Sequence, residues 1–351
     1  MPLFPNGFKK PTLGSLFIIL AIGANSGLDI SSLIFIYTPN SLISDETTIF
    51  IIKKGEGIRE IAASLKKDGF INNEFSFLVY SFLTGKATSL QAGPYRFSSP
   101  MNIPEIVNKL ASGETAKEFI TIVEGWNLEE ISDYLYQKNI FRREPLLKFF
   151  ESVFPQDLAG EFAFLKEIPE GLDFEGYLFP DTYEIEWGSS HYDFTRKALQ
   201  NFDRRLTLEL RQEINRRGKK IFDIVIMASM LEREVKTPED KKLVSGILWK
   251  RLRVGMPLQV DATIVYLLDL VGEKKEQLSA EDLKIDSSYN TYKYKGLPRG
   301  PICNPGIESI LAAIYPQESD FWYYLSKPNG ETVFSKTYED HLAAKQEYLE
   351  D

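Results

Sequence analysis

Two carboxylates separated by one residue stand at the end of an almost uninterrupted apolar run. Residues 221–235 read IFDIVIMASMLEREV, so Glu232 and Glu234 directly follow a stretch of hydrocarbon side chains. This pattern predicts a helix that is buried on every face. A carboxyl group beside hydrocarbon loses hydration, which disfavours its charged form and raises its pKa. Either residue is therefore a candidate general acid. The alternative is a helix end in solvent, where Arg233 and Lys236 pair with the two carboxylates.

Three other segments contain polar and aromatic side chains that suit a sugar substrate. Residues 174–185 read FEGYLFPDTYEI, residues 259–263 read QVDAT, and residues 288–306 read SYNTYKYKGLPRGPICNPG. Aromatic faces stack on pyranose rings, and carboxylates accept hydrogen bonds from hydroxyl groups. The same rings also fit a hydrophobic core. If the second segment is extended, its alternating polar residues share one face. Long loops rich in glycine and proline, such as the third segment, are more often functional than decorative.

The composition narrows the class of substrate. The 351-residue chain has a formal net charge of -9, which argues against broad nucleic-acid binding and favours a neutral, sugar-like ligand. Its single cysteine, Cys303, excludes an intrachain disulfide and a zinc site built on cysteines. Only His191 and His341 are available for histidine-dependent catalysis, and His341 is expected at the surface. We therefore expect neither a metal nor a cofactor.

The N-terminal region predicts export across a membrane. Residues 13–37 are mainly apolar, with Asp29 nearer the outer end, and are long enough, at about 1.5 Å per residue in a helix, to cross a hydrocarbon core of about 30 Å. Lys9 and Lys10 precede this stretch and the next basic residue is Lys53, so the N-terminus is expected in the cytoplasm and the rest of the chain outside it. The predicted location is thus the inner (plasma) membrane, with a single pass. A cleaved signal peptide is the alternative, and it also exports the chain.

Residues 39–48, PNSLISDETT, are polar and predict a linker, and a sequence repeat follows them. The first copy contains Ile52, Gly55, Ile58, Glu60, Ile61, Leu65 and Ile71, and the second contains Ile122, Gly125, Leu128, Glu130, Ile131, Leu135 and Phe141. Each copy predicts a strand, a glycine turn and a helix. Residues 49–115 resemble a LysM-like module, a small α/β module that often binds glycan. Apolar helical spacing by itself indicates packing, not a ligand.

The motifs, taken in order, resemble those of the endolytic murein transglycosylase (YceG-like) family over nearly the whole chain. The matching segments are EGWNLEEI at residues 124–131, FEGYLFPDTYEI, ASMLERE at residues 228–234, RLRVGMPLQVDAT at residues 251–263, and the loop that begins at Tyr289. Arg299 and Ala262 stand where the family pattern usually has proline.

The resemblance implies a reaction and a set of site residues. The implied reaction cleaves the β-1,4 bond between N-acetylmuramic acid and N-acetylglucosamine within peptidoglycan strands, leaves a 1,6-anhydro end and terminates strand elongation. Glu232 matches the family's acid and base, and Glu234 is expected to support it. Penicillin-binding synthases are the implied partners, besides the peptidoglycan strands and the membrane. The residues expected to contact substrate are Glu175, Tyr177, Tyr183, Glu234, Gln259, Asp261, Thr263, Tyr289, Asn290, Tyr292 and Pro298.

The complete prediction is an α+β protein with a transmembrane helix, a LysM-like module and a larger catalytic domain whose buried helix carries the catalytic glutamate. The expected boundaries are 1–12 for the cytoplasmic N-terminus, 13–37 for the transmembrane helix, 38–48 for the linker, 49–115 for the module and 116–351 for the catalytic domain. Residues 116–217 are expected to form a substrate-cleft subdomain, and residues 218–351 the catalytic core.

Two other functions fit the residues. A hydrolytic muramidase needs a second carboxylate about 5 to 9.5 Å from the first, and Asp261, Glu234 and Glu175 are candidates for it. The residues alone therefore leave hydrolysis open, and only the resemblance favours the anhydro product. A noncatalytic envelope scaffold that holds glycan and recruits synthases would require Glu232 to be exposed to solvent and far from the Tyr289 loop.

Overall fold

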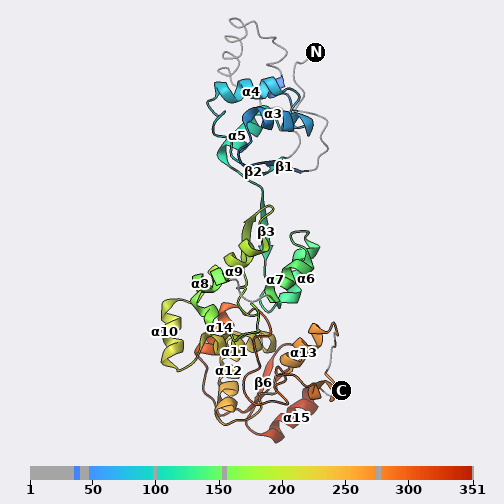
Figure 1. The fold of residues 1–351 in the computed structure, drawn as a ribbon. Helices are drawn as coiled ribbons and strands as arrows, with labels where there is room; N and C mark the ends of the chain where they lie inside the picture. The colour runs from blue at the N-terminus through green and yellow to red at the C-terminus, as the bar shows by residue number, and fades with distance from the viewer. Residues whose placement is uncertain are drawn as a thin grey trace, which may run out of the picture. The chain divides into compact units, whose positions relative to one another are not determined.

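A computed structural model describes residues 35–39, 47–97, 101–151, 156–273, 275 and 278–349 of the chain (Figure 1). It confirms the predicted α+β class, because short helices accompany three two-stranded sheets in these residues. The chain divides into two compact units, Met1–Glu118 with Ile185–Gly188, and Phe119–Glu184 with Ser189–Asp351. No helix within the described part is long and apolar enough to cross a membrane. The span predicted at residues 13–37 lies outside that part except for its last three residues.

The smaller unit is built around a cluster of aromatic rings. Its elements are β1 (Thr48–Ile52), α3 (Ile58–Lys67), α4 (Glu74–Leu83), β2 (Gly93–Phe97) and α5 (Ile103–Ser112). β1 and β2 pair antiparallel, with Phe50 opposite Tyr95. The ring centroids of Phe50, Phe70 and Phe97 lie 4.9 to 5.6 Å apart, a spacing typical of packed aromatic side chains. Burying each phenylalanine contributes about 1.5 to 3 kcal/mol to the stability of this unit.

The sequence repeat is confirmed as a repeated turn and helix. Gly55 and Gly125 have φ angles of 87° and 84°, which are in the left-handed region that glycine adopts most readily. α3 and α6 (Leu128–Gln137) both follow these turns and both begin with a capping box, in which Glu60 and Glu130 accept a hydrogen bond from the N-cap amide. Both copies of the repeat therefore form a glycine turn followed by a helix with a capping box at its start.

The remaining elements complete the chain. They are β3 (Lys117–Thr121), α7 (Arg143–Glu151), α8 (Gln156–Glu161), the 3-10 helix η1 (Ala163–Glu167), β4 (Thr182–Glu186), α9 (His191–Arg205), α10 (Leu208–Arg216), α11 (Ile221–Glu234), α12 (Pro238–Arg253), α13 (Asp261–Leu270), the 3-10 helix η2 (Asp282–Lys284), α14 (Ile307–Ile314), β5 (Tyr323–Ser326), β6 (Thr332–Ser335) and α15 (Tyr338–Tyr348). β3 pairs with β4, and β5 with β6.

Helix α11 forms the centre of the larger unit, as its apolar sequence predicts. Every side chain from Ile224 to Leu231 is buried. α12, α13 and α14 pack against α11, and Figure 1 shows these helices gathered around it. The next helix, α12, begins as predicted, with the Thr237 side chain accepting a hydrogen bond from the Asp240 amide and Pro238 in the first turn.

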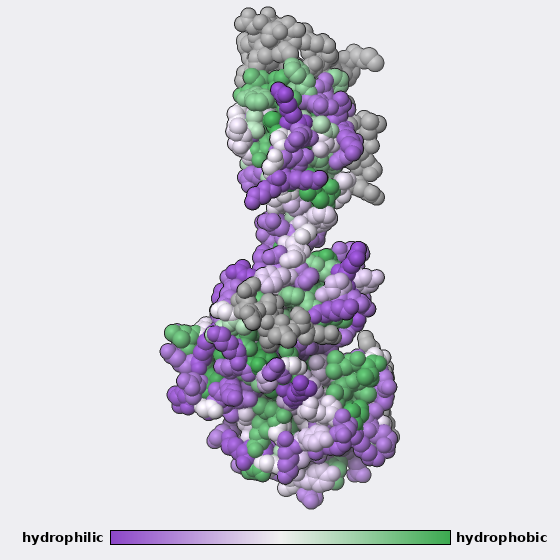
Figure 2. All heavy atoms as spheres, in the orientation of Figure 1, coloured by the Kyte–Doolittle hydropathy of each residue, from purple (hydrophilic) through white to green (hydrophobic). Residues whose placement is uncertain are grey.

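Residues 259–263 do not meet the condition under which their polar side chains would share one extended face, because a helix begins within this segment. α13 begins at Asp261, so residues 261 and 263 belong to a helix and do not share a strand face with Gln259. Thr263 is fully buried, and its hydroxyl bonds the Val260 carbonyl at 2.8 Å. Leu270 and Val271 are exposed at and just beyond the C-terminal end of α13. Figure 2 shows apolar residues gathered in the part of the larger unit where Figure 1 places α13.

Candidate active site

Glu232 and Glu234 lie at the C-terminal end of α11 and have different surroundings. Residues two positions apart in a helix are separated by about 200° around its axis and do not face each other. The two side chains therefore point to opposite sides of α11, although one residue separates them in the sequence. The apolar pattern of the helix contains no information about which of these sides is open.

Glu232 is enclosed in a network of hydrogen bonds. Lys241 Nζ donates to its Oε1 at 2.9 Å, while the Gly306 amide and the Ser309 hydroxyl donate to its Oε2 at 2.9 and 2.7 Å. Only 9% of the Glu232 side chain and 5% of the Lys241 side chain are exposed. Both carboxylate oxygens are thus occupied by partners from α12, α14 and the residue that precedes α14.

Glu234 faces a cavity of about 530 Å³. The walls come from α11, α13, the Tyr292 region, the β5 strand and α15. The polar and aromatic side chains of the lining are Arg233, Glu234, Arg251, Gln259, Asp261, Tyr266, Asp269, Tyr292, Tyr323, Tyr324, Ser326, Tyr338, His341 and Lys345. Polar groups converging in a concave site of this size are typical of a pocket for a small ligand or for part of a polymer.

The Glu234 carboxyl group has the pKa of a group that can exchange a proton at neutral pH. Burial and, next, the charge of Asp261 raise its pKa to about 7. The Ala262 amide, which donates to Glu234 Oε1 at 3.1 Å, and the Tyr324 hydroxyl oppose this rise. A carboxyl group with this pKa is present in both protonation states near neutral pH, as general acid and base catalysis requires.

Asp261 is the second carboxylate of the cavity and is held by the loop that contains Tyr292. The Tyr292 hydroxyl donates a hydrogen bond to Asp261 Oδ1. Burial, followed by the charge of Asp261, raises the pKa of Tyr292, so its hydroxyl stays protonated and remains a donor. The Gln259 amide donates to the Thr291 carbonyl at 3.1 Å, and the Val260 amide to the Thr291 hydroxyl at 2.9 Å. These bonds fix the start of α13 against the loop.

Of the predicted site residues, the structure brings together Glu234, Gln259, Asp261 and Tyr292 around the cavity. The other predicted residues do not line it; they are Glu232, Glu175, Tyr177, Tyr183, Thr263, Tyr289, Asn290 and Pro298. Tyr289 lies just behind the wall, where its ring packs 5.2 Å from that of Tyr266. Asn290 is buried, and its amide bonds the Leu283 and Ile285 carbonyls. Its role is therefore to fold the loop.

The aromatic rings of residues 174–185 are buried in the hydrophobic core and do not form an exposed wall for a sugar. Tyr177 is fully buried, and its ring stacks on Phe164 with a centroid distance of 5.6 Å. Glu175 is also buried, and its carboxyl group accepts hydrogen bonds from the Leu128 amide at 3.0 Å and the Asn304 side chain at 3.1 Å. Burial, then the charge of Asp173, raises the pKa of Glu175 well above its usual value. The sequence pattern did not distinguish core rings from exposed ones.

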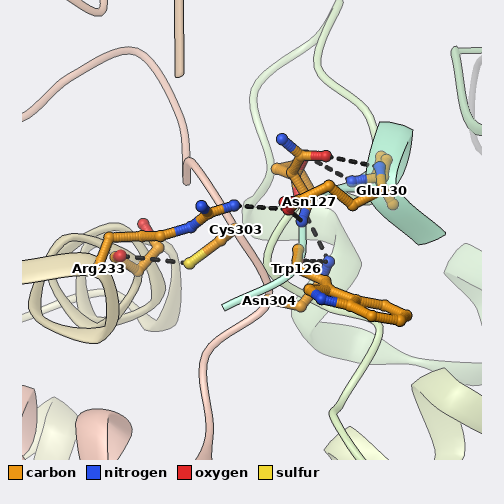
Figure 3. Close-up of polar contacts among 9 residues, drawn as sticks. Trp126, Asn127, Glu130, Arg233, Cys303 and Asn304 are labelled. Carbon is orange, nitrogen blue, oxygen red and sulfur yellow. Dashed lines mark hydrogen bonds and ion pairs between the residues drawn. The ribbon is translucent and has the colours of Figure 1, made fainter. Parts of the chain in front are cut away.

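Figure 3 shows the contacts that support the end of α11. The Arg233 guanidinium pairs with Glu130 of α6 at 2.6 Å. Asn304 donates from its side chain to the Trp126 carbonyl at 3.0 Å, and the Cys303 thiol lies 3.3 Å from the Ser229 carbonyl. Cys303 is fully buried, and burial raises its pKa well above the usual value, so it is a packing residue and not a nucleophile. The loop at residues 303–306 thus joins α11 to the start of α6.

Sequence reasoning missed the part of the cavity wall that α15 supplies. Tyr338, His341 and Lys345 of this helix line the cavity together with Tyr323 of β5. The expected surface position of His341 is wrong, because the residue is half-buried and its ring stacks on Tyr323 at 5.3 Å. α15 reaches the site by packing on β5 and β6, and nothing in its own sequence indicates this contact. The described residues contain no group of three or more His, Cys, Asp or Glu that could hold a metal ion.

Comparisons with known proteins place this site in a family. A model of the YceG-like family matches residues 50–347. The chain belongs to the YceG-like family. It is 34% identical over 314 residues to a Bacillus subtilis protein named endolytic murein transglycosylase, covering 87% of this chain and 86% of that protein. A Streptococcus pneumoniae protein of the same name is 27% identical over an alignment of 311 residues, and the match covers 83% of this chain and 56% of the longer relative.

A solved structure of the same family has the same fold. The crystal structure of a YceG-like protein from Listeria monocytogenes superposes with a TM-score of 0.59 at 30% identity. The match covers 86% of this chain and 100% of the Listeria chain. The predicted family is therefore confirmed by sequence and by structure.

Proposed function

We propose that the chain is an endolytic murein transglycosylase and that Glu234 is its acid and base. The observation that carries the proposal is the position of Glu234 on the cavity with a pKa raised to about 7. The names of the relatives supply the substrate class, which is the glycan of peptidoglycan. This assignment differs from the sequence-based prediction, which gave the role to Glu232.

The environment of Glu232 is the reason for preferring Glu234. A general acid needs a proton that it can deliver to a substrate atom within about 3 Å. Lys241 donates to one oxygen of Glu232, and two further donors occupy its other oxygen. Glu232 therefore holds α11, α12 and α14 together, whereas Glu234 retains access to the cavity.

One carboxyl group suffices for the proposed reaction. Protonated Glu234 donates its proton to the glycosidic oxygen as the bond from that oxygen to muramyl C1 breaks, and the bonding electrons remain on the oxygen. The Glu234 carboxylate then takes the proton of the muramyl C6 hydroxyl as that oxygen bonds to C1. This step closes the 1,6-anhydro ring and restores the protonated acid, and no water is consumed. Asp261 stabilises the positive charge that develops on the sugar ring between these steps.

The second carboxylate in the cavity also favours a rival reaction, hydrolysis. Asp261 interacts electrostatically with Glu234, and it would activate water or act as the nucleophile in a muramidase. Mass spectrometry of the products from purified linear glycan strands distinguishes the two reactions. We expect 1,6-anhydro ends, which are lighter than ordinary reducing ends by one water. If reducing ends are the main product, the protein is a hydrolase and not a transglycosylase.

The pH dependence of cleavage tests the protonation state of Glu234. The reaction starts from the protonated form, so kcat/KM is expected to fall as pH rises through about 7. Asp261→Asn removes a charge that raises the Glu234 pKa, and the fall should then move to lower pH. The measurement is the initial rate of strand cleavage from pH 5 to 9, roughly the range over which such a group titrates.

A control variant separates this effect from a general change in charge. Asp286→Asn removes an exposed carboxylate that pairs with Lys293 and does not line the cavity. Its pH profile should match that of the wild type. If the fall of kcat/KM occurs at the same pH in Asp261→Asn as in the wild type, the fall does not reflect the titration of Glu234.

We further propose that residues 13–37 anchor the protein in the plasma membrane, with the N-terminus in the cytoplasm and the larger unit on the outer side. The apolar stretch and the preceding Lys9 and Lys10 support this orientation. In this position the enzyme would act beside penicillin-binding synthases and terminate strand elongation, and the LysM-like unit would contact glycan. Release of the full chain from membranes by alkaline carbonate would contradict the anchor.

A further inference from the structure

One wall of the cavity is positively charged. Arg251, His341 and Lys345 line it together with Tyr323, and Arg251 lies over the Tyr323 ring at 5.0 Å. The charge that acts most on Glu234 is that of Asp261, whereas the charges that act on His341 are those of Lys345 and Arg251. The lining of the cavity therefore contains basic as well as acidic groups.

Lys345 is the cation of this wall that remains available. Arg251 donates from Nε and Nη2 to the Trp322 carbonyl and from Nη1 to the Leu258 carbonyl, so its donors are largely committed to the backbone. Lys345 is exposed, and its ammonium group has no hydrogen bond or ion pair to any residue that the structure describes. Beside it, burial and the charges of Lys345 and Arg251 lower the pKa of His341. The positive charges of Lys345 and Arg251, which contribute to this lowering after burial, attract a bound anion.

The chemistry of the proposed substrate identifies this anion. The sugar rings of peptidoglycan are neutral, and its carboxylates lie on the lactyl side arm of the muramyl residue or on the peptide attached to that arm. We propose that Lys345, beside the stacked rings of Tyr323 and His341, binds a carboxylate of the muramyl side arm. This subsite rests on the proposed function, because it requires the muramyl residue to occupy the cavity that contains Glu234. It would distinguish a muramyl ring from a glucosaminyl ring by charge.

Cleavage kinetics with three kinds of strand test the subsite. The strands carry intact peptides, or no peptides and a free lactyl carboxylate, or no peptides and a lactyl group converted to its neutral methylamide. For the full chain, Lys345→Met should raise KM about three- to fivefold on a carboxylate-bearing strand, as for an exposed ion pair, and leave kcat almost unchanged. On the neutral strands wild type and variant should have the same KM. A raised KM on strands with intact peptides identifies a peptide carboxylate as the group that Lys345 binds. A raised KM on strands without peptides identifies the lactyl carboxylate.

A matched lysine provides the control. Lys336→Met removes an exposed lysine that pairs with Asp320 and does not line the cavity, and its KM should equal that of the wild type on every strand. Equal KM values for Lys345→Met and wild type on both carboxylate-bearing strands would overturn the subsite. A difference that persists on the neutral strands would also overturn it. Either result leaves the proposed function intact, since that function fails only if the wild type does not cleave or gives reducing ends.

A spectroscopic measurement reports the subsite without catalysis. The chain has only two histidines, so the NMR signal of His341 is assigned by comparison with His191→Gln. N-acetylmuramic acid should raise the pKa of His341, because its carboxylate offsets the charges of Lys345 and Arg251, whereas neutral N-acetylglucosamine should not. An equal response to both sugars, or no response to either, would contradict carboxylate binding at this wall.

Discussion

Glu234→Gln is expected to lower kcat for glycan cleavage by about three orders of magnitude, within the range that general acid and base groups contribute. The amide can neither deliver a proton to the glycosidic oxygen nor accept one from the C6 hydroxyl. Its oxygen can still accept the hydrogen bond from the Ala262 amide, so we expect the fold to be retained. The measurement is single-turnover cleavage of purified strands, with near-wild-type circular dichroism as the check on folding.

A second glutamate serves as the control for this variant. Glu239→Gln changes an exposed residue in the first turn of α12, away from the cavity lining, and should leave kcat unchanged. If Glu234→Gln keeps more than about a tenth of the wild-type kcat, Glu234 is not the proton donor, because a lost general acid costs at least about a hundredfold.

Lys241→Met is expected to destabilise the protein by about 3 to 5 kcal/mol, the typical effect of removing one partner from a buried ion pair. The variant leaves the Glu232 carboxyl group almost fully enclosed and without its ion-pair partner, with only the Gly306 amide and the Ser309 hydroxyl as donors. The double variant Glu232→Gln with Lys241→Met removes both charges, and it should recover most of the lost stability. Urea denaturation of the three proteins gives the free energies of unfolding.

The double variant also decides between the two glutamates. If Glu232 is structural, as its contacts indicate, the double variant should retain kcat within about tenfold of the wild type, since no proton-transfer group is lost. A stable double variant that is as inactive as Glu234→Gln would instead restore the sequence-based assignment of Glu232 as the acid.

Local patterns predicted those parts of the fold that depend on neighbouring residues. The apolar run of α11, the Thr237 cap of α12 and the two glycine turns each follow from rules that act within a few residues. These elements form as predicted because the tertiary structure requires the same conformation that the local sequence prefers.

These local rules do not predict which side chains point toward the site. A helix that is apolar on every face shows no preferred direction, so its sequence treated Glu232 and Glu234 alike. The structure separates them through partners that are distant in sequence, Lys241 and Ser309 for Glu232 and Ala262 for Glu234. The contribution of α15 to the cavity depends in the same way on packing against β5 and β6.

The backbone conformation at Gln259, just before α13, limits which residue types this position accepts. Its φ angle of 54° is in the left-handed region, which costs an ordinary residue roughly 1 kcal/mol and excludes most β-branched ones. Glycine would relieve this conformational strain but would remove a side chain from the cavity wall. Asparagine tolerates the left-handed conformation and keeps an amide there, although on a shorter side chain. Position 259 therefore accepts few residue types, because the same residue belongs both to the turn that aims the Ala262 amide at Glu234 and to the cavity wall.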